Sequence, residues 1–220
     1  MSDTKKHWNE IFSTKPDEKL GWYEDDVSQT LKFIREIPLA PTSTIFVSGA
    51  GTSTIVEELA KLGCHLILND ISDQALLKLR ERIQDDRYEY LLHNMANSLP
   101  RTYEIDLWID RAALHFLLSE EDIATYFRNV KISVKNEGYV LLAEFSKGGA
   151  TMCAGLEVHQ YSLEEMQQRL GEEYVLIASE EYIFVNPYGQ DKPYIYGLFQ
   201  RKKALPVHEK SLEKDCLSVE

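Results

Sequence analysis

From residue 44 onward, short apolar runs alternate with segments in which apolar residues recur every three or four positions. Runs rich in aliphatic and aromatic residues predict strands at residues 44–47, 66–68, 88–92, 105–109 and 139–145. The segments between them have helical spacing, and three begin with an N-cap serine: Ser72, Ser119 and Ser162. Regular strand–helix alternation predicts a parallel sheet with right-handed crossovers.

The two ends of the chain depart from this alternation. Residues 7–37 are predicted to be helical, and residues 174–185 and 194–200 predict consecutive strands, hence an antiparallel hairpin at the sheet edge. The expected fold is α/β, a doubly wound, mostly parallel seven-stranded Rossmann-like sheet with N-terminal helices. We expect one domain over residues 1–200, in which residues 1–40 form a helical cap over the site. Residues 201–220 are expected to be a disordered polar tail.

Composition and charge narrow the classes of function. The 220 residues carry a net charge of −12, which disfavours nucleic acid as a partner. Without a long apolar run or a signal-like start, the chain is expected to be cytoplasmic and not to bind membranes. Its cysteines, Cys64, Cys153 and Cys216, form neither a disulfide framework nor a zinc motif. We therefore expect a metal-independent protein, and the oligomeric state stays open.

A nucleoside-binding pattern follows the first predicted strand. Gly49-Ala50-Gly51 begins the turn into the next helix, and Asp70 ends the second strand about twenty residues later. Glycines allow a ligand to approach the backbone closely, and the carboxylate can accept hydrogen bonds from both ribose hydroxyls. The third glycine of a dinucleotide motif is replaced by Thr54, which argues against an NAD-linked oxidoreductase.

Three motifs carry a resemblance to a known family. They are the aromatic pattern Trp8…Phe12…Trp22, the segment Ile45-Phe46-Val47-Ser48-Gly49-Ala50-Gly51, and the segment Asp110-Arg111-Ala112-Ala113-Leu114. With them, the chain resembles class I methyltransferases that use S-adenosylmethionine (SAM), over about residues 8–201. It looks most similar to the thiopurine S-methyltransferase-like branch and to bacterial methyltransferases of unassigned substrate.

The resemblance implies SAM as the cofactor and assigns residues to its parts. Gly49, Ala50 and Gly51 would lie against the methionine, Asp70 would hold the ribose, and Ile71 would flank the adenine. Further cofactor contacts are implied at Asn94 and Met95 on the adenine, at Trp8 and Trp22 closing the site, and at Asp110. Val47 departs from the pattern, because most class I enzymes carry an acid there. The group that neutralises the SAM amino end is thus left open.

The acceptor side is predicted from the same segments. Asp110 and Arg111 would lie by the transferring methyl as the catalytic pair, with a structural ion pair as the alternative. The other expected substrate contacts are Tyr23, His115, Cys153 and Tyr161. His115 could instead pack on Phe116, and Cys153 lies in a glycine-rich segment, residues 148–156, expected to act as a lid or acceptor wall.

Three functions follow from these observations. The first is methyl transfer to a small molecule, with a thiol or another soft nucleophile as the first candidate. The second is a protein (lysine) methyltransferase, because the Trp8…Trp22-Tyr23 pattern also resembles such enzymes and an acidic surface suits a basic target. The third is a non-catalytic SAM-binding regulator, which Val47 and Asn94 favour.

Overall fold

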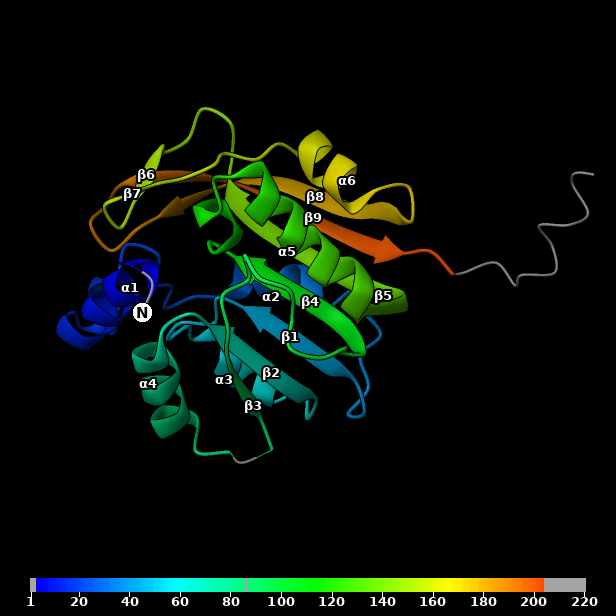
Figure 1. Cartoon of the computed structure of the whole chain (residues 1–220), viewed down its shortest axis with the longest axis horizontal. Helices are drawn as coiled ribbons and strands as arrows, with labels where there is room; N and C mark the ends of the chain where they lie inside the picture. Colours follow the sequence, from blue (N-terminus) through cyan, green and yellow to red (C-terminus); the bar gives the residue numbers. More distant parts are fainter. Residues whose placement is uncertain (1–2, 86, 204–220) are drawn as a thin grey trace, which may run out of the picture.

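The structure is a computed structural model and describes residues 3–85 and 87–203. Seven strands form one twisted sheet in the order β3-β2-β1-β4-β5-β9-β8 (Figure 1). They are β1 (Thr44–Ser48), β2 (His65–Asp70), β3 (Glu89–Leu92), β4 (Ile105–Arg111), β5 (Val134–Phe145), β8 (Tyr174–Val185) and β9 (Asp191–Arg201). Strands β1 to β5 are parallel, and β9 is antiparallel to both β5 and β8. The predicted fold, with its antiparallel edge hairpin, is confirmed.

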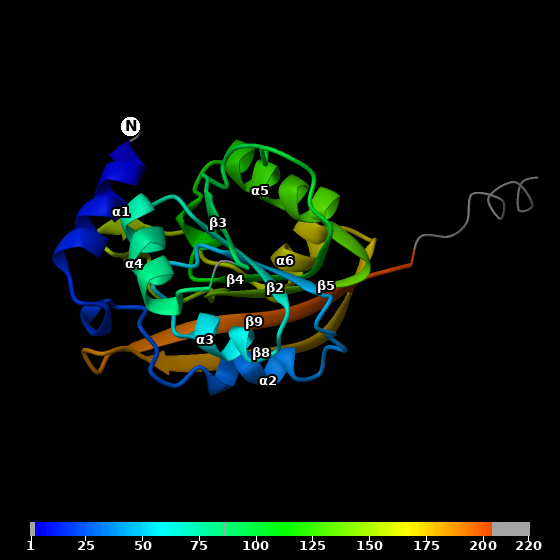
Figure 2. The ribbon, with the colours of Figure 1, turned by 90° about the horizontal axis from the view of Figure 1, so that it is seen from below.

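Helices cover both faces of the sheet, as Figure 2 shows. Helices α2 (Ser28–Ile34) and α3 (Ile55–Ala60) lie on one face, and α5 (Glu120–Ser133) and α6 (Leu163–Leu170) lie on the other. Helix α4 (Asp73–Ile83) connects β2 to β3 and lies beside α1 (Asp3–Thr14). Shorter elements are the 3-10 turns η1 (Asp17–Lys19) and η2 (Leu114–Phe116), and the hairpin strands β6 (Met152–Cys153) and β7 (Leu156–Glu157). Among the described helices, none is both long and apolar enough to cross a membrane.

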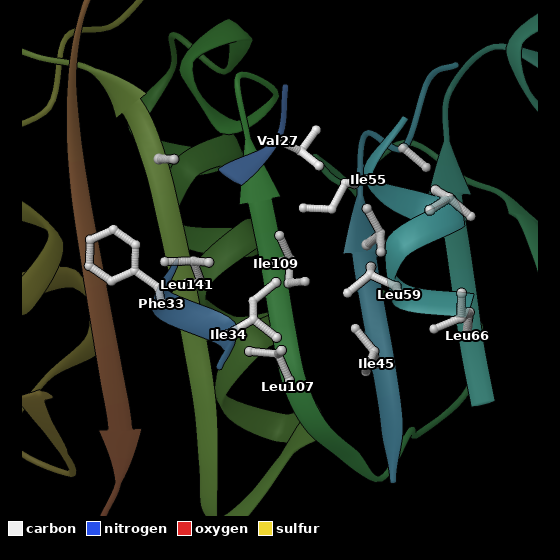
Figure 3. Packing of buried hydrophobic residues seen from close by; sticks show 14 of the residues in the cluster. Val27, Phe33, Ile34, Ile45, Ile55, Leu59, Leu66, Leu107, Ile109 and Leu141 are labelled. Atoms are coloured by element: carbon white, nitrogen blue, oxygen red, sulfur yellow. The ribbon is translucent and has the colours of Figure 1, made fainter. Parts of the chain in front are cut away.

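The core on the α2–α3 face is aliphatic. Leu59 of α3 and Ile34 of α2 pack onto Ile45, Leu107 and the neighbouring strand residues (Figure 3). Leu59, Ile45 and Leu107 are fully buried. Burial of each such side chain stabilises the fold by roughly 1.5–3 kcal/mol, which fixes the sheet under the site.

The core on the opposite face is aromatic. Phe46 of β1 stacks on Trp108 of β4 with ring centroids 4.1 Å apart. The indole N–H of Trp108 donates to the hydroxyl of Tyr126 in α5 at 2.9 Å. This bond satisfies the polar edge of a fully buried ring and ties α5 to the sheet.

The predicted helix starts are confirmed at all three N-cap serines. The hydroxyls of Ser72, Ser119 and Ser162 accept from backbone N–H groups three residues on, at 3.1–3.2 Å. Helix α3, in contrast, begins at Ile55 and not at Thr52. The preceding turn holds Gly49 and Gly51 at positive φ, so the chain reaches helical geometry later than the sequence pattern predicts.

The N-terminal segment is not helical throughout residues 7–37, contrary to the prediction from the sequence pattern. Helix α1 ends at Thr14, and Pro16 follows in an extended conformation that cannot continue it. Residues 20–27 are irregular and lead into α2, which begins at Ser28. This irregular stretch brings Trp22, Tyr23 and Glu24 over the ends of the strands.

The other end of the domain also departs from expectation. Arg201, assigned to the tail, is the last residue of β9, and its guanidinium donates to the Lys131 carbonyl at 2.8 Å. The rest of the predicted tail, from residue 204, lies outside the described residues. The glycine-rich stretch 148–156 forms most of the small β6–β7 hairpin, which packs Ala154 and Leu156 onto the N-terminal aromatic cluster.

Candidate active site

A cavity of about 1300 Å³, counting the part open to solvent, lies at the carboxyl ends of β1, β2 and β4. The strand order reverses between β1 and β4, and ligands of open α/β sheets bind at such a point. Residues of the N-terminal cap, among them Trp8 and Trp22, also line the cavity. Eleven of the predicted site residues line it: Trp8, Trp22, Tyr23, Gly49, Ala50, Gly51, Asp70, Ile71, Asn94, Met95 and Arg111.

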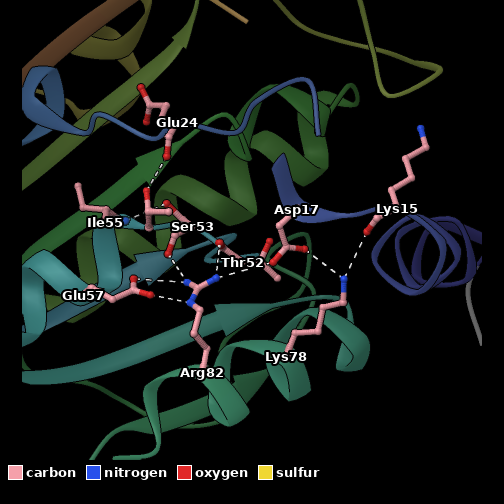
Figure 4. Close-up of polar contacts among 10 residues, drawn as sticks. Lys15, Asp17, Glu24, Thr52, Ser53, Ile55, Glu57, Lys78 and Arg82 are labelled. Atoms are coloured by element: carbon pink, nitrogen blue, oxygen red, sulfur yellow. Dashed lines mark hydrogen bonds and ion pairs between the residues drawn. The ribbon is translucent and has the colours of Figure 1, made fainter. Parts of the chain in front are cut away.

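The turn after β1 forms the floor of this cavity. Gly49 and Gly51 adopt φ values of +60° and +52°, which side-chain-bearing residues rarely adopt. A Cβ on Gly49 would lie 2.3 Å from Ala113 Cβ, and one on Gly51 would lie 3.3 Å from Phe12 Cζ. From α4, Arg82 donates to the carbonyls that follow the turn, those of Thr52 at 2.9 Å and Ser53 at 2.8 Å (Figure 4). The backbone is thus held close to whatever occupies the cavity.

Asp70 ends β2 beside this turn. One carboxylate oxygen accepts from the Gly51 N–H at 2.9 Å, and the other accepts from the Ser72 N–H at 2.8 Å. A carboxylate oxygen can accept a second hydrogen bond, so both oxygens retain capacity for ligand hydroxyls. Burial raises the pKa of Asp70 to about 6, against the opposing effect of these N–H groups. The carboxylate is therefore ionised at neutral pH and can bind a ribose.

The segment after β3 lines the cavity beyond Asp70. Asn94 and Met95 lie there with Ile71, as expected, and His93 joins them. The side-chain oxygen of Asn94 accepts from the Ala96 N–H at 3.0 Å, which fixes the turn and leaves this oxygen one lone pair for a ligand. This end of the cavity can therefore take a flat ring against an apolar wall with one polar edge.

A cluster of aromatic side chains covers the cavity. Trp8 lies edge-to-face with Trp22 and with Phe116, at centroid distances of 5.6 Å and 4.8 Å. The cap is also tied to α4, because Ser72 Oγ donates to Asn9 Oδ1 at 2.7 Å. The first segment of the chain therefore encloses the site, and Phe116 contributes to this roof from η2.

Arg111, at the end of β4, is held on several sides. Its Nη2 lies 2.8 Å from Oε1 of Glu24, and its Nη1 donates to the Trp22 carbonyl at 3.2 Å. The guanidinium also lies over the rings of Phe184 and Tyr194, with its Cζ 4.9 Å and 5.0 Å from their centroids. Burial raises the pKa of Glu24, and Arg111 opposes that effect. Sequence reasoning missed Glu24, because the segment around it was predicted to be helical.

Asp110 does not join Arg111 in the cavity, contrary to the predicted catalytic pair. Neighbouring residues of a strand point to opposite faces, so the Asp110 side chain lies on the α5 side of the sheet. There it is fully buried and accepts from the Tyr126 hydroxyl at 2.7 Å and from the Leu114 N–H at 3.0 Å. Its contacts hold the turn after β4 and the α5 helix in place.

His115 and Tyr161, predicted substrate contacts, are both fully buried behind the cavity wall. The His115 ring stacks on Phe145 at 4.6 Å, and its Nδ1 lies 2.8 Å from Glu144 Oε2. Burial lowers the pKa of His115 to about 3, so the ring is neutral. The predicted alternative, packing on Phe116, is observed as well, at 4.5 Å between centroids.

Cys153 lines a second, smaller cavity, together with Trp22 and Phe145. Leu20 and Trp22 line both cavities, so the two cavities are neighbours. Burial raises the pKa of the Cys153 thiol to about 11, which keeps it protonated. Cys153 can therefore form a wall of this second cavity but is not a nucleophile at neutral pH.

Comparison with known proteins agrees with this geometry. Residues 45–138 match the family model described as "Methyltransferase domain". Ribosomal RNA small subunit methyltransferase A of Thermotoga petrophila is 30% identical over 79 residues, 36% of this chain but only 26% of that protein's length.

Solved methyltransferase structures share the whole fold. A SAM-dependent methyltransferase from Anabaena variabilis matches with a TM-score of 0.71 and 14% identity, over 90% of this chain and 93% of that one. N-methyltransferase NodS from Bradyrhizobium japonicum, solved with S-adenosylhomocysteine (SAH), matches with a TM-score of 0.71 and 13% identity, over 91% and 99% of the two chains.

The matched segment is similar to a methyltransferase domain, and nearly the whole chain has the fold of solved SAM-dependent methyltransferases. The residues present suit SAM, because the buried Asp70 carboxylate lies beside a glycine turn that leaves little room for side chains. Asp70 would hold the ribose, Asn94 and Met95 the adenine, and Gly49 to Gly51 the methionine. Membership of the thiopurine S-methyltransferase-like branch stays a prediction.

Proposed function

We propose that this enzyme transfers the methyl group of SAM to a small-molecule acceptor, with a thiol or another soft nucleophile as the accepting group. The observation that carries the proposal is the roof over the cavity. Trp8, Trp22 and Phe116 close it with edge-to-face contacts, and Tyr23 lines it beside them. An enclosed aromatic cavity suits a small acceptor better than an extended polypeptide.

The state of the acidic groups near the site supports a soft nucleophile. SAM supplies an activated methyl group, so the protein has mainly to align the acceptor and to remove a proton where the acceptor carries one. Glu24 is paired with Arg111, Asp70 would be engaged by the ribose, and His115 is buried. A thiolate needs no base, whereas an amine or hydroxyl would have to compete for one of these groups.

Two further observations agree with this choice. The sequence resembles the thiopurine S-methyltransferase-like branch, whose acceptor is a thiol. The net charge of −12 disfavours a polyanion such as RNA as the acceptor. A protein (lysine) methyltransferase and a SAM-binding regulator are the competing functions, and the assay below separates them.

The test is a transfer assay with SAM labelled on its methyl group. The purified protein is added to a desalted cell extract, to the small-molecule fraction of that extract, and to a panel of aromatic and aliphatic thiols. We expect label in small molecules and, in the panel, on sulfur. An Asp70→Ala variant is the matched control and should transfer no label.

Each other result contradicts the proposal. Label confined to protein would establish a protein methyltransferase. Label on small-molecule amines or hydroxyls alone would refute the soft nucleophile. No transfer to any of these acceptors, by a protein that binds SAH, would favour the regulator.

A further inference from the structure

The site lacks a carboxylate on the strand that usually provides one. Val47 occupies that place in β1, lines the cavity and is 4% exposed. Val47 pairs with Ile109 in the neighbouring strand β4, and Arg111 lies two residues beyond Ile109 on the same face. The Arg111 guanidinium therefore lies beside Val47, where β1 offers no carboxylate. A buried cation needs an anionic or polar partner.

Glu24 provides that partner from outside the sheet. It is 8% exposed, lines the cavity, and places Oε1 2.8 Å from Arg111 Nη2. Its backbone is fixed next to the glycine turn, because the Thr54 hydroxyl donates to the Glu24 carbonyl at 2.7 Å. The irregular segment 20–27 thus delivers a carboxylate to the cavity near Val47.

The order of strands places this pair opposite the nucleoside end of the cavity. Asp70 ends β2, and Asn94 follows β3, so the adenosine half of the ligand lies over β2 and β3. Gly49 and Gly51 follow β1, and Arg111 ends β4 on the other side of β1. A ligand whose ribose lies at Asp70 and whose chain passes over the glycine turn therefore places its other end near Glu24 and Arg111.

We propose that Glu24 and Arg111 together bind the aminocarboxylate end of SAM, with Glu24 accepting from the ammonium and Arg111 donating to the carboxylate. This inference rests on SAM as the cofactor of the proposed function, but not on the identity of the acceptor. A zwitterion carries the two charges that match the pair, so its entry leaves neither buried group without a partner. The cap thereby becomes part of the cofactor site, and Arg111 serves the donor and not the acceptor.

Two ligands that differ only in this end provide the test. SAH has the aminocarboxylate, whereas 5′-methylthioadenosine keeps the adenosine and the thioether and lacks it. Binding of both is measured by calorimetry on the full-length protein and on Glu24→Gln. We expect SAH binding to weaken about 10- to 100-fold and methylthioadenosine binding to stay within twofold.

The control variant is Glu181→Gln, the same substitution at an exposed position of β8, which should leave both affinities unchanged. Unchanged SAH binding by Glu24→Gln would overturn the proposal. Equal weakening of both ligands would also overturn it, since Glu24 would then only support the fold. Failure of the wild-type protein to bind either ligand would refute the cofactor itself, whereas an error about the acceptor appears only in the transfer assay.

Discussion

Replacing Gly49 with alanine tests the tightest contact in the site. The added methyl group would lie 2.3 Å from Ala113 Cβ, well inside the distance at which two carbon atoms can coexist. Ala113 follows β4 and Gly49 follows β1, so this contact sets how closely the two strand ends approach. Relief would require one of the two turns to move, and both of them form the cavity.

The expected cost is the sum of two effects. A residue with a side chain at φ +60° costs about 1–2 kcal/mol. Forcing a methyl group into a packed contact costs about 1–3 kcal/mol. Gly49→Ala should therefore lower the free energy of unfolding by about 2–5 kcal/mol. That is a large share of the roughly 5–15 kcal/mol by which a domain is stable.

Alanine substitutions at two other glycines separate the backbone cost from the packing cost. Gly148 has φ +82° with open space where a Cβ would lie, so Gly148→Ala should show only the backbone cost. Gly51→Ala should lie between the two, because its Cβ would lie 3.3 Å from Phe12 Cζ, an atom that can shift. Urea unfolding followed by circular dichroism measures all three variants. Equal losses for Gly49→Ala and Gly148→Ala would refute the close approach of the two turns.

Three more predictions follow from the same structure. Because burial raises the pKa of Asp70 to about 6, SAH binding should strengthen as pH rises from 5 to 7, and calorimetry should find this dependence lost in Asp70→Asn. Leu59→Ala should lower the free energy of unfolding by about 2–5 kcal/mol in urea, since Leu59 is fully buried; a loss below 1 kcal/mol would contradict the packing. With a thiol pKa of about 11, Cys153 should react with iodoacetamide at pH 8 far more slowly than an unfolded thiol, as peptide mass spectrometry would show.

Local patterns were enough to predict the sheet and to bring the glycine turn and Asp70 to the same cavity. The glycines and Asp70 follow directly from strand ends, so their neighbours in space are set by the parallel order of β1 and β2. The N-cap serines are equally local, since each hydroxyl bonds a group three residues away. Such features depend on short stretches of sequence and not on how distant segments pack.

The rest of the site was predicted less well, for two physical reasons. Glu24 enters the cavity through long-range packing of the irregular segment 20–27, which no short pattern reveals. Asp110 was paired with Arg111 because they are adjacent in sequence, although adjacent residues of a strand face opposite ways. Applying that alternation to residues 105–111 would have placed Asp110 with Trp108 and Arg111 with Ile109, as observed.

The attachment of α2 has a consequence for the order in which the fold becomes complete. Phe33 of α2 stacks on Tyr196 of β9 at 5.5 Å, and Gln29 bonds Glu180 of β8 at 3.1 Å. A ribosome makes this helix early, but the part of its docking surface that β8 and β9 provide is made much later. We expect a chain that lacks β8 and β9 to hold α2 less firmly, so that the segment carrying Glu24 is fixed over the cavity only after these strands have joined the sheet.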